Sequence, residues 1–310
     1  MNNIDYWLSR SIDRNNLSIQ EENALLREIY DLLADTYQST IDELYIFYTE
    51  YADEEGITIS QAQEILSPIE LRDCADRIKR LSELLYDIDI STPFGQQRYT
   101  QLQREITLLR NRGRVTRQQM LNDAINEQWI KTALQIDERL GEHLAMNYER
   151  SFKDGLEEAG VKRIINISRR QIESAILIPK FTYHFSSAVW RNKDRLVTFI
   201  NTELRRGIVN GTDVRKTAKI LKDNLVVTKY EAKRLVVTET SIVQIDGRME
   251  GYRSSGVVQK LQVLVHMDNK TCGRCKDHEN SIVDLPDAII GDNIPPFHPI
   301  CRCDVSPYFE

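Results

Sequence analysis

Proline is nearly absent from the first 285 residues of this chain. Only Pro68, Pro93 and Pro179 occur there, whereas five of the eight prolines stand in the last 25 residues. Proline interrupts a helix because it lacks the backbone N–H and clashes with the preceding turn. Apolar residues recur at helical spacing through the proline-poor part, as in the stripe that begins at Leu25 and Ile29. The sequence therefore predicts a mainly helical body and a mostly irregular tail.

Capping signals divide the helical body into segments. Ser18, followed three residues later by Glu21, has the pattern of a capping box and predicts the start of a long helix. Thr212 and Thr228 are read in the same way as starts of two later helices. Further helices are expected over about 68–86, 96–111, 116–150 and 190–206. After Gly256 the pattern changes, and alternating β-branched residues predict a strand over 257–265 and a second short strand over 280–285.

Four of the five cysteines lie in the last 39 residues, as Cys272 and Cys275 and then Cys301 and Cys303. His298 precedes Cys301 by three positions and repeats the spacing of the first pair with an imidazole in place of one sulfur. Two side chains separated by two residues reach one metal ion from a tight turn, and a structural zinc site needs four N or S ligands. We therefore expect one structural Zn²⁺ bound by Cys272, Cys275 and Cys301, with either His298 or Cys303 as the fourth ligand.

Disulfide bonds and unligated thiols are the alternatives to zinc. The first residues lack the basic and apolar pattern of a signal peptide, and no window approaches the roughly 20 apolar residues of a membrane span. We therefore expect a protein made in a reducing cytoplasm, where disulfides are rare. The fifth cysteine, Cys74, stands alone in a helical pattern and is expected to pack as a small apolar side chain.

The net charge of −6 conceals a segregation along the chain. Residues 1–100 carry a net charge of −12, whereas residues 101–250 carry +8. Such a contrast indicates two different partner surfaces, or two halves that attract each other. The mainly α fold that we expect has an elongated helical N-terminal part, a helical middle and a small C-terminal zinc-binding module of β and irregular structure. Its three regions are an acidic long-helix partner-binding region over 1–150, a basic helical domain over 151–256 and the zinc-knuckle module over 257–310.

Two features of these regions point to partners. Residues 1–100 are amphipathic and rich in tyrosine, and tyrosine is favoured in the cores of interfaces. Four arginines that would be able to contact DNA phosphates cluster between two expected helices, at Arg110, Arg112, Arg114 and Arg117. Because no aromatic residues are interleaved for base stacking, a solvated turn is the alternative.

A zinc-finger-type nuclease or DNA-processing enzyme is the alternative function, because paired knuckles also frame some nucleases. Such an enzyme needs a catalytic histidine on a hairpin between the knuckles and a following helix with further ligands. His266 and His278 lie in the hairpin region, but only seven residues follow Cys303, which leaves no room for that helix. The sequence therefore favours a protein without enzymatic activity.

Several motifs follow one another between about residues 170 and 305. A helix that carries Thr238-Glu239 precedes Gly256 and the expected strand, and the two cysteine elements follow as 268–275 and 296–303. In this order the motifs resemble the Mu F-like head morphogenesis family, the minor head proteins of tailed bacteriophages. An aromatic residue is common in the family on the strand before the first knuckle, where this sequence has Val265-His266.

The resemblance implies a structural role in the virion. Members of the family are low-copy proteins that are added near the portal vertex while the head assembles, and some are thought to bind DNA or to leave the head with it. The implied partners are the portal protein, the major capsid protein, or both, together with packaged double-stranded DNA bound without sequence preference. The implied location is the head interior or the portal vertex of the virion, after assembly in the host cytoplasm. No membrane partner and no enzymatic activity are implied.

Overall fold

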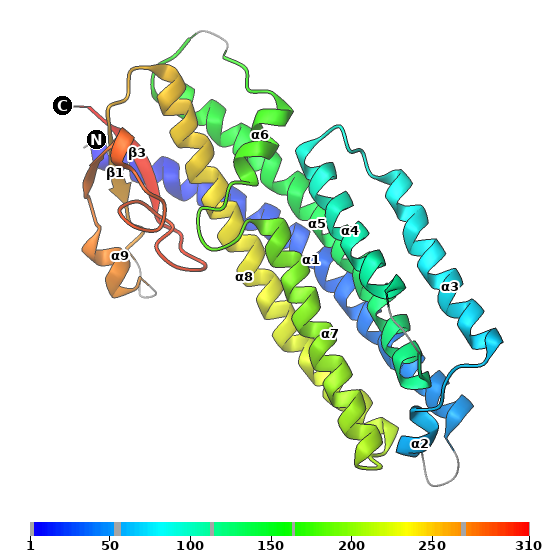
Figure 1. Ribbon diagram of the computed structural model, residues 1–310. Helices are drawn as coiled ribbons and strands as arrows, with labels where there is room; N and C mark the ends of the chain where they lie inside the picture. The colour runs from blue at the N-terminus through cyan, green and yellow to red at the C-terminus, as the bar shows by residue number, and fades with distance from the viewer. Residues whose placement is uncertain (1–2, 53–56, 112–114, 163–164, 268–270, 310) are drawn as a thin grey trace. The chain divides into compact units, whose positions relative to one another are not determined.

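The computed structural model describes residues 3–52, 57–111, 115–162, 165–267 and 271–309. Helices make up most of these residues and a small sheet lies near the C-terminus (Figure 1), so the expected mainly α class is confirmed. The α-helices are α1 (Asn3–Tyr51), α2 (Ile59–Ala62), α3 (Pro68–Glu83), α4 (Pro93–Arg110), α5 (Arg117–Glu158), α6 (Arg169–Ile176), α7 (Phe185–Val209), α8 (Val214–Ser255) and α9 (Gly273–Asp277). The strands are β1 (Lys260–Leu264), β2 (Ile282–Asp284) and β3 (Asp304–Tyr308), and the 3-10 helices are η1 (Leu84–Asp87) and η2 (Leu285–Asp287).

The chain forms two compact units, each built from segments that are distant in sequence. Unit 1 comprises Met1–Arg27, Arg139–Phe185 and Ala232–Glu310, and unit 2 comprises Glu28–Glu138 and Ser186–Glu231. The helices α1, α5 and α8 therefore contribute to both units. The linear regions 1–150, 151–256 and 257–310 were expected from charge and composition, and their assignment to partner binding and metal binding stays a prediction.

Two of the expected helix starts are wrong. Ser18 lies inside α1, where its hydroxyl donates a hydrogen bond to Glu22 at 3.0 Å. Thr228 lies inside α8, where its hydroxyl is bonded to the carbonyl of Asn224 at 3.2 Å. Serine and threonine within a helix commonly bond to the preceding turn, so the residue type alone does not distinguish a cap from an interior position. True capping boxes occur at Ser67 before α3 and at Ser168 before α6.

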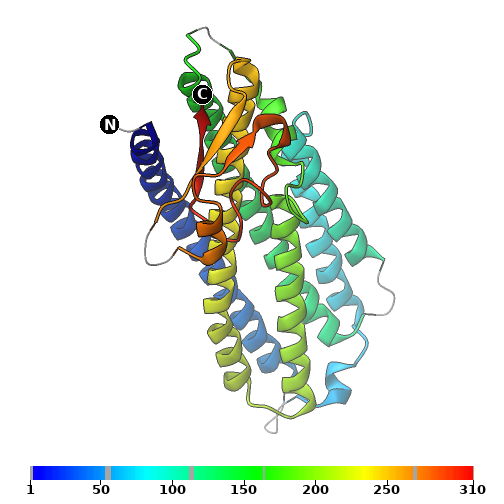
Figure 2. The same cartoon turned by 90° about the vertical axis from the view of Figure 1, so that its left-hand side faces the viewer.

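The core of unit 2 contains helices that run side by side in both views (Figures 1 and 2). The Tyr37 ring packs edge-on against Trp129 at a centroid distance of 5.1 Å, and the Tyr37 hydroxyl donates to Asn224 at 2.9 Å. Lys193 is buried and forms an ion pair with Glu105 at 2.8 Å. These contacts join α1, α4, α5, α7 and α8 through interior polar groups that are each paired.

Several tyrosines of α1 have partners within unit 2. Tyr37 is buried, Tyr30 lies 5.3 Å below the ammonium group of Lys229, and Tyr51 donates to Glu70 at 2.8 Å. Tyr45, by contrast, is 40% exposed. The interface role expected of these tyrosines stays a prediction.

Helices α5 and α8 approach each other closely in unit 1, and glycines make this possible. A Cβ atom on Gly251 would lie 2.4 Å from the carbonyl oxygen of Phe152. Equivalent atoms on Gly155 and Gly247 would lie 2.5 Å from the carbonyl oxygens of Arg248 and Tyr148. Real Cβ atoms do not approach backbone this closely, so the two backbones are in contact only because these side chains are absent.

We expect Gly251→Ala to destabilise the protein by about 1–3 kcal/mol, because the added methyl group would force two helices apart in a packed core. The matched control is Gly273→Ala, since a Cβ atom there meets no other atom within 4 Å. Thermal unfolding of both variants measures the difference in their stability. Equal stabilities of the two variants would contradict the close packing of α5 and α8.

The sheet packs on the C-terminal part of α8 within unit 1. The strand order is β2-β1-β3, and both pairings are antiparallel, with Leu261 opposite Val283 and Val263 opposite Val305. The strands β1 and β2 confirm the two expected strands, whereas β3, which contains Pro307, was not expected. One buried cluster includes Ile245, Met249 and Tyr252 of α8, the inner residues of β1, and three of the tail cysteines. The tail thus shares its core with α8.

Candidate metal centre

The first knuckle is formed at the start of a short helix. Cys272 is the N-cap residue of α9, and its sulfur accepts a hydrogen bond from the backbone N–H of Cys275 at 3.4 Å. This bond folds the chain back so that the two sulfurs share one side of the turn. Cys275 is buried, whereas Cys272 is partly exposed at the rim.

The second knuckle is a tight turn attached to α8. The backbone N–H of Cys301 donates to the carbonyl of His298 at 3.1 Å, and Ile300 between them has a φ of 62°. The N–H of Ile300 donates to the hydroxyl of Thr238 at 3.2 Å. Because an isoleucine with positive φ is strained, this bond to α8 helps to hold the turn. Thr238 therefore anchors the knuckle to α8.

The five candidate ligands converge in two overlapping groups. The ligand atoms of Cys272, Cys275 and His298 lie within 4.8 Å of one another, and so do those of Cys275, Cys301 and Cys303. Cys275 belongs to both groups. Its sulfur lies 3.8 Å from the sulfur of Cys301 and 3.2 Å from Nε2 of His298.

These distances fit a tetrahedral metal ion. Two thiolates that bind zinc at a bond length of about 2.3 Å and a tetrahedral angle lie about 3.8 Å apart. Soft sulfur and imidazole ligands select zinc or a similar metal rather than magnesium or calcium. The residues present are therefore able to hold a metal ion, and the donor set is that of a closed structural site.

His298 presents the correct nitrogen to such an ion. Its Nδ1 lies 2.8 Å from the carbonyl oxygen of Pro299, and because a carbonyl only accepts, Nδ1 carries the proton. Nε2 is then the free lone pair, and it faces Cys275. A hydrogen bond that fixes the tautomer in this way is typical of metal-binding histidines. Both His298 and Cys303 thus lie within reach of the cluster, and the fourth ligand stays a prediction.

The thiols of the cluster have strongly perturbed acidities. A hydrogen bond from the Cys303 thiol lowers the pKa of Cys301 to about 5, and the same interaction raises the pKa of Cys303. Burial raises the pKa of Cys275 to about 12. The backbone N–H of Cys275 also lowers the pKa of Cys272. A bound metal ion would deprotonate the cysteine thiols that bind it and release protons.

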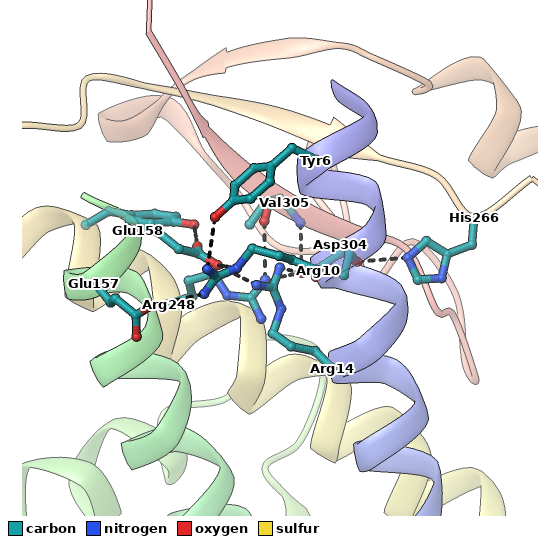
Figure 3. Close-up of polar contacts among 11 residues, drawn as sticks. Tyr6, Arg10, Arg14, Glu157, Glu158, Arg248, His266, Asp304 and Val305 are labelled. Atoms are coloured by element: carbon teal, nitrogen blue, oxygen red, sulfur yellow. Dashed lines mark hydrogen bonds and ion pairs between the residues drawn. The ribbon is translucent and has the colours of Figure 1, made fainter. Parts of the chain in front are cut away.

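A second set of polar residues surrounds Asp304, next to Cys303 (Figure 3). Asp304 is buried and accepts hydrogen bonds from Ser11 at 2.7 Å and from Arg14 at 3.0 Å, and it also contacts Arg248. Although burial opposes both shifts, the arginines hold the pKa of Asp304 well below its usual range, and Asp304 raises the pKa of Arg248. No spacing in the sequence links these residues, because three distant segments supply them.

The same network extends to the loop before the first knuckle. Nε2 of His266 lies 2.8 Å from the hydroxyl of Ser11, and the side-chain amide of Asn15 lies 2.8 Å from Nδ1 of His266. Asn15 also donates to the carbonyl of Arg302 at 2.9 Å, and Arg302 binds Glu22. The N-terminal part of α1 thus contacts the loop before the first knuckle and the backbone of the second knuckle, both within unit 1.

This network differs from a nucleophilic triad. In a triad the histidine lies between the serine and the acid, so that it can take the hydroxyl proton. Here Ser11 lies between His266 and Asp304 and donates its own proton to Asp304. Ser11 is also almost fully buried, with 1% of its surface exposed. The arrangement orders α1 against β3 and offers no free nucleophile.

The two histidines considered for a nuclease have partners other than the thiols. His266 binds Ser11 and Asn15, and the ring of His278 stacks on Phe297 at a centroid distance of 4.2 Å. Neither histidine belongs to the two ligand groups found among the described residues.

The arginine cluster lies in unit 2, and only part of it can be placed. Arg112 and Arg114 lie outside the described residues. Arg110 is exposed and donates to the hydroxyl of Ser82 at 2.9 Å. Arg117 forms ion pairs with Glu64 and Glu70 and lies over the ring of Tyr51. Contact of this cluster with DNA stays a prediction.

Glu239 is a half-buried carboxyl group on α8. It lines a small pocket with Ile176, Ile242 and Val243, and burial raises the pKa of Glu239 to about 8. Between about pH 4.3, where an unfolded glutamate ionises, and pH 8, the folded state keeps a proton that the unfolded state has lost. The stability that Glu239 contributes therefore falls as the pH rises through this range.

We expect Glu239→Gln to raise the free energy of unfolding at pH 8 by on the order of 1–3 kcal/mol, and to have little effect near pH 4.5. Urea unfolding at the two pH values measures this difference. The exposed Glu279 of the same unit supplies the control variant, Glu279→Gln. If Glu239→Gln raises the free energy of unfolding equally at both pH values, Glu239 is ionised in the folded protein.

The C-terminal part of the chain is similar to a known protein family. Residues 198–306 match the family model described as Phage Mu protein F like protein. This stretch is Mu F-like. The match confirms the resemblance predicted from the knuckles and the preceding helix. No curated protein and no solved structure matches the chain.

The Mu F-like region, residues 198–306, contains all five candidate ligands, β1, β2 and the first part of β3. It ends within β3, two residues before Tyr308. It does not include the start of α1, although Ser11, Arg14 and Asn15 contact this region directly. In the part of the chain that the structure describes, no helix has the length and apolarity needed to cross a membrane.

Proposed function

We propose that this protein is a minor head protein of a tailed bacteriophage and that it enters the head near the portal vertex during assembly. The observation that supports this proposal best is the coincidence of the family match with the cysteine cluster. The match covers residues 198–306, and the ligand atoms within it converge in two groups that share Cys275.

In this proposal the metal is zinc and its role is structural. Four protein ligands leave no open coordination position for water, so the ion would hold the two knuckles together without taking part in chemistry. Cys272 and Cys275 would supply one side, and Cys301 with His298 or Cys303 would supply the other. The tail shares a core with α8, and the metal would add the cross-link that fixes its loops. The protein would have no enzymatic activity.

The proposed partners are the portal protein, the major capsid protein, or both. The acidic N-terminal helices are the proposed docking part, because their charge disfavours contact with DNA. The basic stretch 101–250 is the proposed contact with packaged double-stranded DNA, bound through phosphates and therefore sensitive to salt. The protein would be located in the head interior or at the portal vertex, after assembly in the host cytoplasm.

Purified virions and portal rings of the phage that encodes the chain provide the test. We expect the full chain to be present in virions at low copy number and to copurify with portal rings, where imaging would locate it. Removing residues 1–100 is unsuitable as a test of docking, because Ser11, Arg14 and Asn15 contact the C-terminal module. Absence of the chain from virions would contradict the proposal, and cleavage of plasmid DNA with Mg²⁺ or Mn²⁺ would favour the nuclease.

A further inference from the structure

One face of α8 in unit 2 is both basic and apolar, and it is exposed. Four cationic side chains lie on this face, Arg215, Lys216, Lys219 and Lys222. Large apolar side chains lie between and beyond them, with exposed fractions of 73% for Val226, 60% for Tyr230, 53% for Val227 and 42% for Ile220. At 100° per residue the four cationic and four apolar side chains share one side of the helix. We refer to them as the basic stripe. One exposed carboxylate, Asp223, lies among them and pairs with Lys219 at 3.8 Å.

One face of α1 in unit 2 has the opposite charge. Residues 28–51 contain six acidic residues and no lysine or arginine. Asp31, Asp35, Asp42 and Glu50 are exposed, and Tyr45 and Ile46 stand exposed beside them, with 59% of Ile46 accessible. These six side chains also share one side of their helix. We refer to them as the acidic stripe.

The two stripes point away from each other within the unit. Tyr37 marks the side of α1 that faces α8, because its hydroxyl bonds to Asn224 and Thr228. At 100° per residue the centre of the acidic stripe lies about 150° from Tyr37. The centre of the basic stripe lies about 120° from Asn224 and about 160° from Thr228. The stripes therefore lie on opposite flanks of the α1–α8 pair and cannot neutralise each other.

The composition of the basic stripe favours a protein partner over DNA. Phosphate contacts need cations but gain nothing from valine and isoleucine side chains beside them. A protein surface that carries carboxylates around apolar side chains would pair with the cations and remove Val226, Val227 and Tyr230 from water. The acidic stripe of α1 has this composition and a comparable length.

We propose that copies of this chain associate head to tail, with the basic stripe of one copy against the acidic stripe of the next. Because the two surfaces differ, each copy keeps one free stripe after pairing, and the association continues to a ring or a chain. The occupant of each stripe is therefore a second copy of this protein. This inference assigns residues 215–230 to a second copy and leaves the rest of the basic stretch 101–250 as the proposed DNA contact. It does not depend on the metal site, which lies in unit 1.

Paired charge reversals test this arrangement on the full chain. One variant, Lys216→Glu with Lys219→Glu, removes the basic stripe, and another, Asp31→Lys with Asp35→Lys, removes the acidic stripe. We expect the unmodified protein to show a mass that grows with concentration in sedimentation velocity at low salt and that falls at high salt. Each variant alone is expected to associate about tenfold more weakly or worse.

Mixing the two variants gives the sharpest result. Each retains the stripe that the other lacks, and the two reversed stripes are themselves opposite in charge. Head-to-tail pairing therefore predicts that association returns when the two variants are mixed. The control is the α3 variant Arg72→Glu with Lys79→Glu, which changes the same number of exposed charges in unit 2 and should associate like the unmodified protein. Thermal unfolding checks that every variant is folded.

Two outcomes would overturn the proposal. The first is a monomer at about 100 μM and low salt, a concentration at which even weak contacts of this kind are populated. The second is a mixture of the two variants that stays monomeric while the unmodified protein associates. If the protein is monomeric and the lysine variant loses affinity for double-stranded DNA, the basic stripe is a nucleic-acid surface and the inference is wrong.

Discussion

Replacement of Cys275 by serine is expected to remove the bound zinc and to unfold the C-terminal module. Cys275 is the one residue common to both groups of candidate ligands, so its loss leaves neither group with three members. Serine is a poor zinc ligand, and the metal supplies folding energy to loops that have little core of their own. Elemental analysis should fall from about one zinc per chain to near zero.

Limited proteolysis would report the structural consequence. The variant should be cut readily between residues 266 and 309, whereas helices of unit 2 should stay protected, because that unit contains none of the candidate ligands. Cys74→Ser is the matched control, since Cys74 lies on α3 and outside the cluster. A Cys275→Ser protein that retains zinc and a protected tail would show that the site does not hold the module.

Elemental analysis of zinc in two more variants would identify the fourth ligand. Spacing favours His298, because it repeats the geometry of the first knuckle, and its Nε2 lies 3.2 Å from the sulfur of Cys275. Cys303 is buried and lies in the group with Cys275 and Cys301. If His298 is the ligand, His298→Ala should weaken zinc binding far more than Cys303→Ser does. The reverse order would assign the position to Cys303.

The knuckles were predictable from sequence because their geometry is local. Cys272 and Cys275 are joined by a single helical turn, and His298 and Cys301 by a single tight turn, so spacing alone fixes each half. Helix content was predictable for a similar reason, since proline and apolar spacing act over a few residues. The strand β1 was predictable because it lies in a valine-rich stretch, residues 257–265, whereas β3 is equally short and contains a proline.

The network around Asp304 was not predictable in this way. Its members come from α1, α5, α8 and the tail, and only the folded chain brings them together. Arg14, Glu158 and Arg248 each look like an ordinary charge on a solvated helix face. The capping signals failed at Ser18 and Thr228 for a related reason, because their hydroxyl groups find partners within the helix. A weak signal was present in Gly155, Gly247 and Gly251, whose spacing marks a close helix contact beside the network.

Replacement of Asp304 by asparagine is expected to destabilise the protein by about 3–5 kcal/mol, because it leaves buried arginines without their counter-charge. Arg248 has 2% of its surface exposed, and its guanidinium contacts Asp304 directly. Arg14 would keep Glu158 as a partner, so Arg248 bears most of the cost. Urea unfolding of the zinc-loaded protein measures the loss, with the exposed Asp277→Asn as the control.

A double-mutant cycle would separate the ion pair from other effects of the change. Arg248→Met removes the cation and keeps an apolar chain of similar length. In the Arg248→Met background, Asp304→Asn should therefore lower the free energy of unfolding much less. Coupling near zero would mean that Asp304 acts through Ser11 or through the backbone of β3 instead.

The pH dependence of the stability that Asp304→Asn loses provides an independent check. The pKa of Asp304 is held well below its usual range in the folded protein, by Arg248 and Arg14 against the effect of burial. The stabilisation that it contributes is therefore complete above the ordinary carboxyl pKa of about 3.9 and is lost as the pH falls below that value. The gap between the original protein and the Asp304→Asn variant should stay constant from pH 7 to about pH 5 and narrow below about pH 4. A gap that narrows already between pH 7 and pH 6 would assign the effect to a different group, with His266 as the nearest titratable neighbour through Ser11.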